Sequence, residues 1–212
     1  MIDSSRFTHL LIDLDDTVYP SSTGIWDMVG GRIKSFMLDV MHFPKEKAAQ
    51  IREYLLRKYG TTLRGLEIEY GVNTQHYLDY VHDVDLSVML KPAPVLSTVL
   101  AQYPNLIKWI FTNASREHAE RVLRYLQLRE HFSGIIDITD VMPWCKPYPE
   151  SFHIAFKIVG VTDPARCIFI DDRVDNVTAA LDLGIQPILV SPHPHADIPT
   201  IEILEHLPRV LA

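Results

Sequence analysis

The sequence is poor in cysteine, has no excess of positive charge and contains no long apolar run. Its two cysteines, Cys145 and Cys167, have no cysteine or histidine neighbour at metal-ligand spacing. This excludes a disulfide framework and a thiolate metal site, and it favours a reducing compartment. With 20 Lys and Arg against 27 Asp and Glu, the formal net charge is −7. An acidic chain of this kind offers no broad basic surface for a nucleic acid polymer or an anionic membrane.

Membrane insertion and secretion are also not expected from the sequence. No stretch approaches the roughly 18 apolar residues of a membrane-spanning helix. The first residues include Asp3 and lack the apolar segment of a signal peptide. We therefore expect a cytoplasmic protein that acts without a membrane or a nucleic acid partner. The sequence specifies no oligomeric state.

Short apolar segments alternate with helix-period patterns over most of the chain. The segments that read as buried strands are 9–12, 106–111, 167–170 and 187–190, with a weaker one at 134–138. Apolar residues recur at helical spacing within 119–126, 152–159 and 177–184. Strand–helix alternation predicts the α/β class, with a Rossmann-like, doubly wound parallel sheet and helices on both of its faces.

Residues 21–90 depart from this alternation. Their apolar spacing predicts helices near 25–37, 46–59, 64–70 and 74–82, with a kink at the Gly30-Gly31 pair. A proline-rich stretch, Lys91-Pro92-Ala93-Pro94, then marks the return to the alternating pattern. We predict an α/β core from residues 1–20 and 91–212, interrupted by an all-helical insertion at 21–90 that is placed to cover a site.

Polar residues follow the predicted strands where each strand ends. They are Asp13 and Asp15, Thr112 and Asn113, Lys146 in the loop after the weaker strand, and Asp171 with Asp172. Each has an ordinary explanation as a helix cap, a loop lysine or a turn residue. Because the carboxyl ends of parallel strands share one edge of the sheet, however, all of them are expected to converge on one cleft.

Phosphoryl transfer would give this set a single purpose. Neighbouring carboxylates repel each other unless a cation lies between them or one stays protonated, and carboxylate oxygens are the ligands that Mg²⁺ prefers. A lysine and a hydroxyl can take the remaining phosphate oxygens, and an aspartate can act as the nucleophile.

In order and spacing, the strand-end residues resemble the four motifs of the haloacid dehalogenase superfamily. The matching strings are Asp13-Leu14-Asp15-Asp16-Thr17, Thr112-Asn113, Lys146-Pro147 and Asp171-Asp172. The helical insertion stands where that superfamily has its cap. Longer strings, among them YGTTLRGL at 59–66 and FTNASREHAERVL at 111–123, are most similar to the pyrimidine 5′-nucleotidase-type group.

The resemblance implies a role for each residue. Asp13 would be the nucleophile that forms an aspartyl-phosphate, and Asp15 the acid and base. Thr112, Asn113 and Lys146 would bind the substrate phosphate. Mg²⁺ would be held by Asp13, the Asp15 carbonyl and Asp172, with Asp171 bound directly or through water. Asp16 is expected to serve in a turn and to have no catalytic role. Arg173 and Asn176 depart from the common pattern of the superfamily.

The expected substrate is a small phosphomonoester. Resemblance to the subgroup suggests a nucleoside 5′-monophosphate, with sugar phosphates and phosphoglycolate as alternatives. Arg64 and Tyr19 are the preferred candidates to contact the leaving group, ahead of Trp26, His76, Tyr77 and His82, while His118 is expected on the surface of a helix. Two alternative functions belong to another class. One is a non-catalytic phospho-acceptor module, against which the chain length and the order of the motifs argue. The other is an inactive interaction protein.

Overall fold

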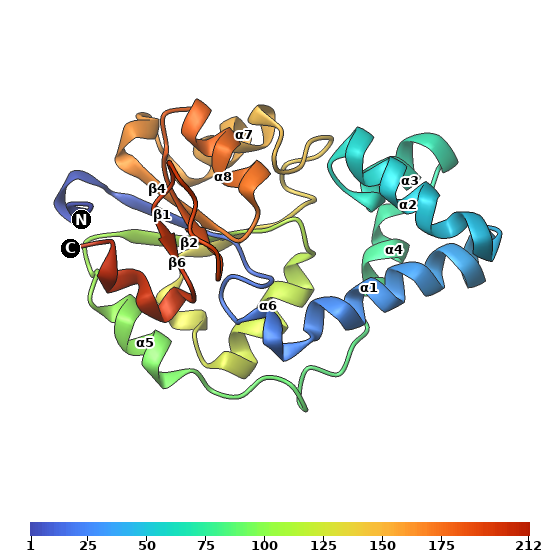
Figure 1. The fold of residues 1–212 in the computed structure, drawn as a ribbon, viewed down its shortest axis with the longest axis horizontal. Coiled ribbons are helices and arrows are strands. Elements are labelled where there is room, and N and C mark those ends of the chain that lie inside the picture. Colours follow the sequence, from blue (N-terminus) through green and yellow to red (C-terminus); the bar gives the residue numbers. More distant parts are fainter. The chain divides into compact units, whose positions relative to one another are not determined.

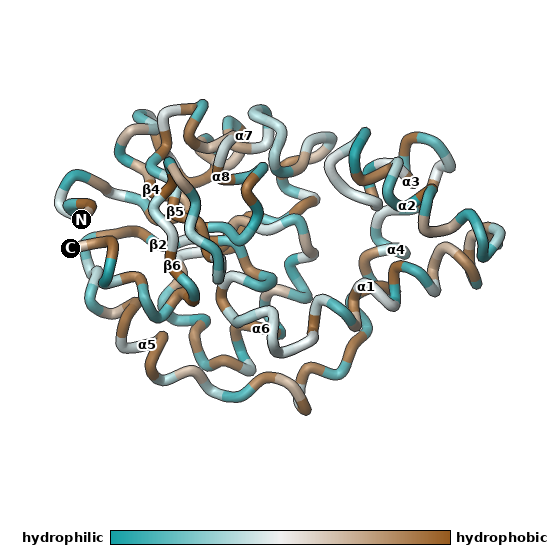
Figure 2. Tube along the Cα trace, in the orientation of Figure 1, coloured by the Kyte–Doolittle hydropathy of each residue, from teal (hydrophilic) through white to brown (hydrophobic).

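The computed structural model describes all residues from Met1 to Ala212 and divides the chain into two compact units. The first combines Met1–Thr23 with Leu90–Ala212, and the second is Gly24–Met89. Figure 2 shows hydrophobic residues, in brown, within each unit taken by itself. Buried hydrophobic side chains occur in both units, among them Leu10 and Phe169 in the first and Phe36 and Leu55 in the second, so each unit has a core of its own. None of the helices has both the length and the apolar character needed to cross a membrane.

The first unit is built on a six-stranded parallel sheet with the strand order β3-β2-β1-β4-β5-β6. The strands are β1 (His9–Ile12), β2 (Ile107–Phe111), β3 (Gly134–Ile136), β4 (Cys167–Asp171), β5 (Gln186–Val190) and β6 (Thr200–Ile201). All four residues of β1 are buried, as expected for a central parallel strand. The predicted doubly wound parallel sheet is confirmed, and only the two-residue β6 lies outside the predicted strands.

Helices cover both faces of this sheet, with α7 and α8 on one side and α5 and α6 on the other (Figure 1). Their bounds are α5 (Pro94–Ala101), α6 (Arg116–Leu126), α7 (Pro149–Val159) and α8 (Val174–Asp182). Short 3-10 segments lie at Ser4–Arg6, Ser21–Thr23, Arg129–His131, Pro164–Arg166 and Leu204–Arg209. The layers follow from the sequence pattern, because each helix presents one apolar stripe to the sheet.

Three phenylalanines form the centre of the core on the α7–α8 side. Phe111 and Phe152 pack edge to face with their ring centroids 5.3 Å apart, and Phe152 and Phe169 do so at 5.2 Å. All three side chains are fully buried. Because Phe111 ends β2 and Phe169 lies in β4, this packing holds in place the strand ends that carry the site.

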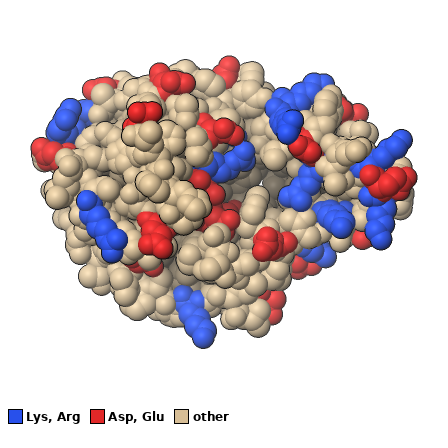
Figure 3. Space-filling model, in the orientation of Figure 1, with Lys and Arg blue, Asp and Glu red and all other residues tan.

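The second unit is all helical. It contains α1 (Ile25–Ser35), a π-helical segment (Phe36–Val40), α2 (Lys45–Tyr59), α3 (Thr62–Tyr70) and α4 (Thr74–Val81). The kink predicted at Gly30-Gly31 is wrong, since α1 runs through both glycines and the irregular geometry begins at Phe36. Lys and Arg as well as Asp and Glu side chains occur on the face of each unit drawn in Figure 3.

Candidate active site

The candidate site lies where the strand order reverses direction. Asp13 directly follows β1, and Asp171 ends the neighbouring strand β4. The backbone N–H of Asp13 donates to the carbonyl of Ile170 at 2.8 Å, so the ladder between these strands continues into the site. Open α/β sheets bind their ligands at such a switch point, outside the carboxyl ends of the strands.

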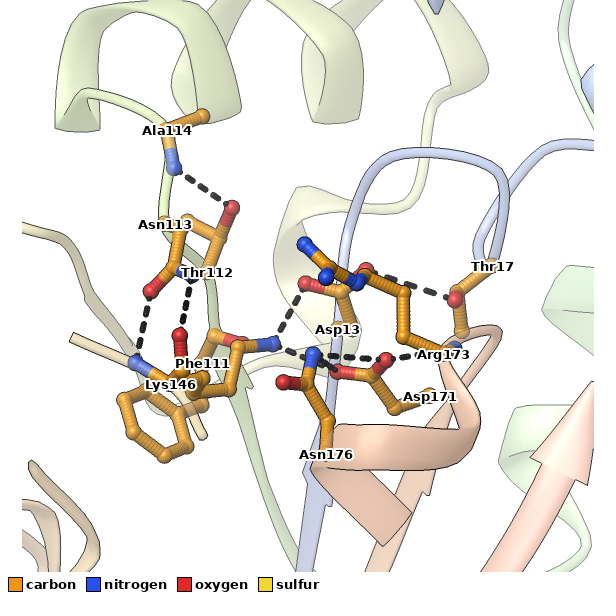
Figure 4. Close-up of polar contacts among 10 residues, drawn as sticks. All are labelled: Asp13, Thr17, Phe111, Thr112, Asn113, Ala114, Lys146, Asp171, Arg173 and Asn176. Carbon is orange, nitrogen blue, oxygen red and sulfur yellow. Dashed lines mark hydrogen bonds and ion pairs between the residues drawn. The ribbon is translucent and has the colours of Figure 1, made fainter. Parts of the chain in front are cut away.

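Lys146 occupies the centre of this edge (Figure 4). Its ammonium donates at 2.7 Å to each of three oxygens: Asp13 Oδ1, Asp171 Oδ2 and the carbonyl of Phe111. Burial lowers the pKa of Lys146, but the carboxylates of Asp13 and Asp171 outweigh this and raise it. The lysine is therefore a permanently charged group at the meeting point of three strand ends, as the sequence predicted.

Asn113 fixes the backbone of that lysine. Its amide group donates to the carbonyl of Lys146 and its amide oxygen accepts from the N–H of Lys146, both at 3.0 Å (Figure 4). Both ends of its side-chain amide are thus committed to this loop, and the expected contact of Asn113 with the substrate phosphate stays a prediction. Thr112 is buried, and its hydroxyl oxygen accepts from the N–H of Ala114 at 3.0 Å.

Three carboxylates at this edge are close enough to share one cation. Ligand oxygens of Asp13, Asp171 and Asp172 all lie within 4.8 Å of one another. Burial, and then the negative charge of Asp171, raises the pKa of Asp172 to about 7. Burial also raises the pKa of Asp13, against the opposing effect of Lys146. If all three are ionised, Lys146 leaves two negative charges unbalanced, so the donor set fits a divalent cation with oxygen ligands.

Asp171 has more protein donors than Asp13, whose Oδ1 accepts from Lys146 and whose Oδ2 accepts from the Thr17 hydroxyl at 3.4 Å. In Asp171, Oδ1 accepts from the N–H of Arg173 at 2.8 Å, Oδ2 accepts from Lys146, and the amide of Asn176 lies 2.9 Å from each oxygen. The side chain of Asp171 is fully buried. Of the two motif departures, Arg173 thus contributes a backbone donor and Asn176 a side-chain donor.

Asp15 is held by two side chains that the sequence did not assign to it. The hydroxyl of Tyr19 donates to Asp15 Oδ1, and Nε2 of His118 lies 2.9 Å from the same oxygen. Burial, reinforced by the charge of Asp15, raises the pKa of Tyr19, which keeps its hydroxyl protonated. Tyr19 is buried and contacts the carboxyl group itself, a contact that the expected role at the leaving group did not include.

The expectation of a surface position for His118 is wrong, since this side chain is fully buried. Helical spacing could have indicated this, because His118 lies four residues before the buried Val122 on α6.

Thr17 and Asp16 also lie at this edge of the sheet. Thr17 places its hydroxyl 3.4 Å from Asp13 Oδ2, and Asp16 lies in a turn with φ of 57°, as expected for turn chemistry.

Apart from Tyr19, the candidates for substrate contact lie in the helical unit. Arg64, on α3, forms an ion pair with Glu67 at 2.5 Å. Tyr77 is buried in the core of this unit, edge to face with Phe36 at 5.0 Å between ring centroids. Trp26 is 43% exposed. The side chain of Arg64 is 24% exposed, so Arg64 and Trp26 both offer accessible surface, whereas Tyr77 serves packing.

Known proteins are similar to this chain in sequence and in fold. Phosphate metabolism protein 8 of Saccharomyces cerevisiae is 28% identical over 193 residues, which cover 84% of this chain and 59% of that protein. The chain thus spans less than two thirds of the length of this curated relative.

Two solved structures share the fold. A HAD phosphatase from Thermococcus onnurineus has a TM-score of 0.61 at 15% identity, covering 96% of this chain and 97% of that one. L-2-haloacid dehalogenase from Xanthobacter autotrophicus also has a TM-score of 0.61, at 16% identity, covering 96% and 98%. Residues 7–184 match the family of haloacid dehalogenase-like hydrolases. This match spans most of the chain, and the chain therefore belongs to the haloacid dehalogenase-like hydrolases.

Proposed function

We propose that this hydrolase is a Mg²⁺-dependent phosphomonoesterase that acts through an aspartyl-phosphate on Asp13. The observation that carries the proposal is the contact of the Lys146 ammonium with both Asp13 and Asp171, beside the carboxylate of Asp172. One buried cation and several carboxylates at a single sheet edge suit a ligand that brings both a divalent metal and a phosphate.

The choice of phosphate ester over alkyl halide rests on Asp15. A haloacid dehalogenase shares this fold, so the fold alone does not select the reaction. A halide leaves as an anion without a proton, whereas an alkoxide leaving group needs an acid. The carboxyl group of Asp15, held by Tyr19 and His118, is suited to supply one.

The proposed reaction has two steps. A carboxylate oxygen of Asp13 attacks phosphorus, the bond from phosphorus to the leaving oxygen breaks, and Asp15 donates its proton to that oxygen. Asp15 then takes a proton from water, whose oxygen attacks phosphorus and breaks the bond to Asp13. Lys146 offsets phosphate charge and Thr112 provides a hydroxyl at the same edge, while a bound Mg²⁺ would supply further positive charge against the phosphate oxygens.

Asp13 and Asp172 are the proposed side-chain ligands of the metal, together with the backbone carbonyl of Asp15. We place Asp171 in contact with the metal through water, because the N–H of Arg173, the amide of Asn176 and the Lys146 ammonium all donate to its two oxygens. The helical unit, with Arg64, is proposed to set substrate preference. Nucleoside 5′-monophosphates are the first candidates, and sugar phosphates and phosphoglycolate are the alternatives.

The test is hydrolysis of p-nitrophenyl phosphate with MgCl₂ and with EDTA. The parent protein should turn over only with the metal, and Asp13→Asn should be inactive. Asp15→Asn should lose roughly 10²–10⁴-fold in rate. On this substrate the loss falls on the second step, in which Asp15 takes a proton from water, because p-nitrophenolate leaves without an acid. Asp175→Asn, at an exposed aspartate of α8, is the matched control and should keep full activity. An inactive parent protein, or an active Asp13→Asn, would refute the mechanism. A panel of phosphomonoesters would then rank the substrates.

A further inference from the structure

We infer that His118 and Tyr19 are positioning residues that hold one oxygen of Asp15, Oδ1, so that the other oxygen of this carboxyl group exchanges the proton with the leaving group. The inference rests on the proposed function, because it concerns the acid of that reaction. It adds two residues that the motifs of the superfamily do not include.

Both contacts converge on the same atom. The Tyr19 hydroxyl donates to Asp15 Oδ1, and Nε2 of His118 lies 2.9 Å from it. The side chain of His118 is fully buried, while that of Asp15 is 12% exposed. A hydrogen bond to Oδ1 from each of two directions fixes the rotation of the carboxyl plane, and with it the direction in which the second oxygen points.

The two positioning side chains come from independent parts of the core unit. Tyr19 follows Asp15 by four residues in the loop that leaves β1. His118 belongs to the first turn of α6, whose N-cap Ser115 accepts from the N–H of His118 at 3.3 Å. Because the cap fixes the start of α6, the imidazole is supported by the helix and not by contact with Asp15 alone. Such support of a reacting group by neighbouring side chains is a common requirement of precise proton transfer.

A plain structural role and a positioning role predict different kinetics. If the two residues only fill the core, their loss should affect all substrates alike. If they aim the acid, the loss should be greatest where the leaving group depends on protonation. An alkoxide needs the proton, whereas p-nitrophenolate leaves readily without one. The ratio of kcat/KM for p-nitrophenyl phosphate to kcat/KM for glycerol 2-phosphate therefore reports the role.

The experiment compares Tyr19→Phe, His118→Leu and His118→Gln with the parent chain on these two substrates. Tyr19→Phe removes a single oxygen, so it tests the inference even if His118→Leu does not fold. Tyr103→Phe is the matched control, since this buried tyrosine donates to the carbonyl of Leu211 at 2.9 Å, outside the site. The inhibition constant of inorganic phosphate reports whether the phosphate site is intact.

We expect Tyr19→Phe and His118→Leu to lower kcat/KM for glycerol 2-phosphate by about 10–100-fold. This is less than the roughly 10²–10⁴-fold that loss of the general acid itself would cost. The loss on p-nitrophenyl phosphate should be several-fold smaller, and the phosphate inhibition constant should stay within about twofold because Lys146 is untouched. His118→Gln, which keeps a side-chain N–H donor, should recover part of the loss. Tyr103→Phe should leave the ratio unchanged.

Equal losses on both substrates, an unchanged ratio in Tyr19→Phe, or a weakened phosphate site with an unchanged ratio would each overturn the inference. Failure of the proposed function has a different signature. In that case the parent chain shows no Mg²⁺-dependent turnover of either substrate, or Asp13→Asn retains it. A parent that is active, together with a Tyr19→Phe variant that matches it, refutes only the positioning role.

Discussion

Asp172→Asn separates two effects of the acidic cluster: the folding stability that it costs when no cation is bound, and the stability that it provides when it binds one. Burial and the neighbouring Asp171 raise the pKa of Asp172 to about 7, from 3.8. Ionisation of Asp172 therefore opposes folding when no cation is bound. The contribution of Asp172 to stability is therefore most favourable below pH 3.8, where this carboxyl group is protonated in the folded and the unfolded protein alike. Stability is lost as the pH rises to about 7, because the folded protein holds the proton that the unfolded chain has released.

The size of the effect follows from the shift. At 1.36 kcal/mol for each pKa unit, the raised pKa of Asp172 costs the folded protein up to about 4 kcal/mol at pH 8 and about 2 kcal/mol at pH 5. An asparagine is neutral at both values. With EDTA present, Asp172→Asn should therefore be more stable than the parent, by a margin that is larger at pH 8 than at pH 5. With Mg²⁺ the margin at pH 8 should shrink to about 1 kcal/mol, since a cation at 100 times its Kd stabilises the parent by about 2.7 kcal/mol.

Urea unfolding, followed by circular dichroism and by tryptophan fluorescence, measures these differences. The two probes are needed because two compact units can unfold separately. Asp175→Asn is the control, since it removes an exposed carboxylate three residues away and should change stability by under about 1 kcal/mol at either pH. A metal-free Asp172→Asn that is no more stable than the parent, or one that Mg²⁺ still stabilises, would refute the reasoning.

Two more predictions concern a buried charge and a close helix contact. Lys146→Met leaves Asp13 without its buried counter-charge, so the free energy of unfolding in EDTA at pH 8 should fall by about 3–5 kcal/mol. Mg²⁺ should restore part of this loss. Unchanged stability would show that the ion pair does not stabilise the folded protein. Gly65→Ala and Gly31→Ala should change the free energy of unfolding in opposite directions. A Cβ at Gly65 would lie 2.7 Å from Leu55 and should cost about 1–3 kcal/mol, whereas Gly31 in α1 has open space and should gain about 0.5–1 kcal/mol, as thermal unfolding can show.

Much of the fold was predictable because its signals are local. The run at 9–12 and the strands near 107–111, 167–171 and 186–190 are apolar and end in polar residues, and alternation with helices implies parallel strands. Once the strands are parallel, Asp13, Thr112 and Asp171 must share an edge. Strand β6 was not predicted because two residues carry no periodicity. The π-helical segment at Phe36–Val40 was missed because apolar spacing does not distinguish it from an α-helix.

The sequence by itself determined the class of fold, the edge at which the chemistry gathers and the residue types present there. Only the tertiary structure decided which atom contacts which. It committed Asn113 to the backbone of Lys146 and brought His118 and Tyr19 to one oxygen of Asp15. The physical reason is that periodicity reports the face on which a side chain lies. A hydrogen bond between residues 15 and 118 depends on where two separate elements pack and on which rotamer fits between them.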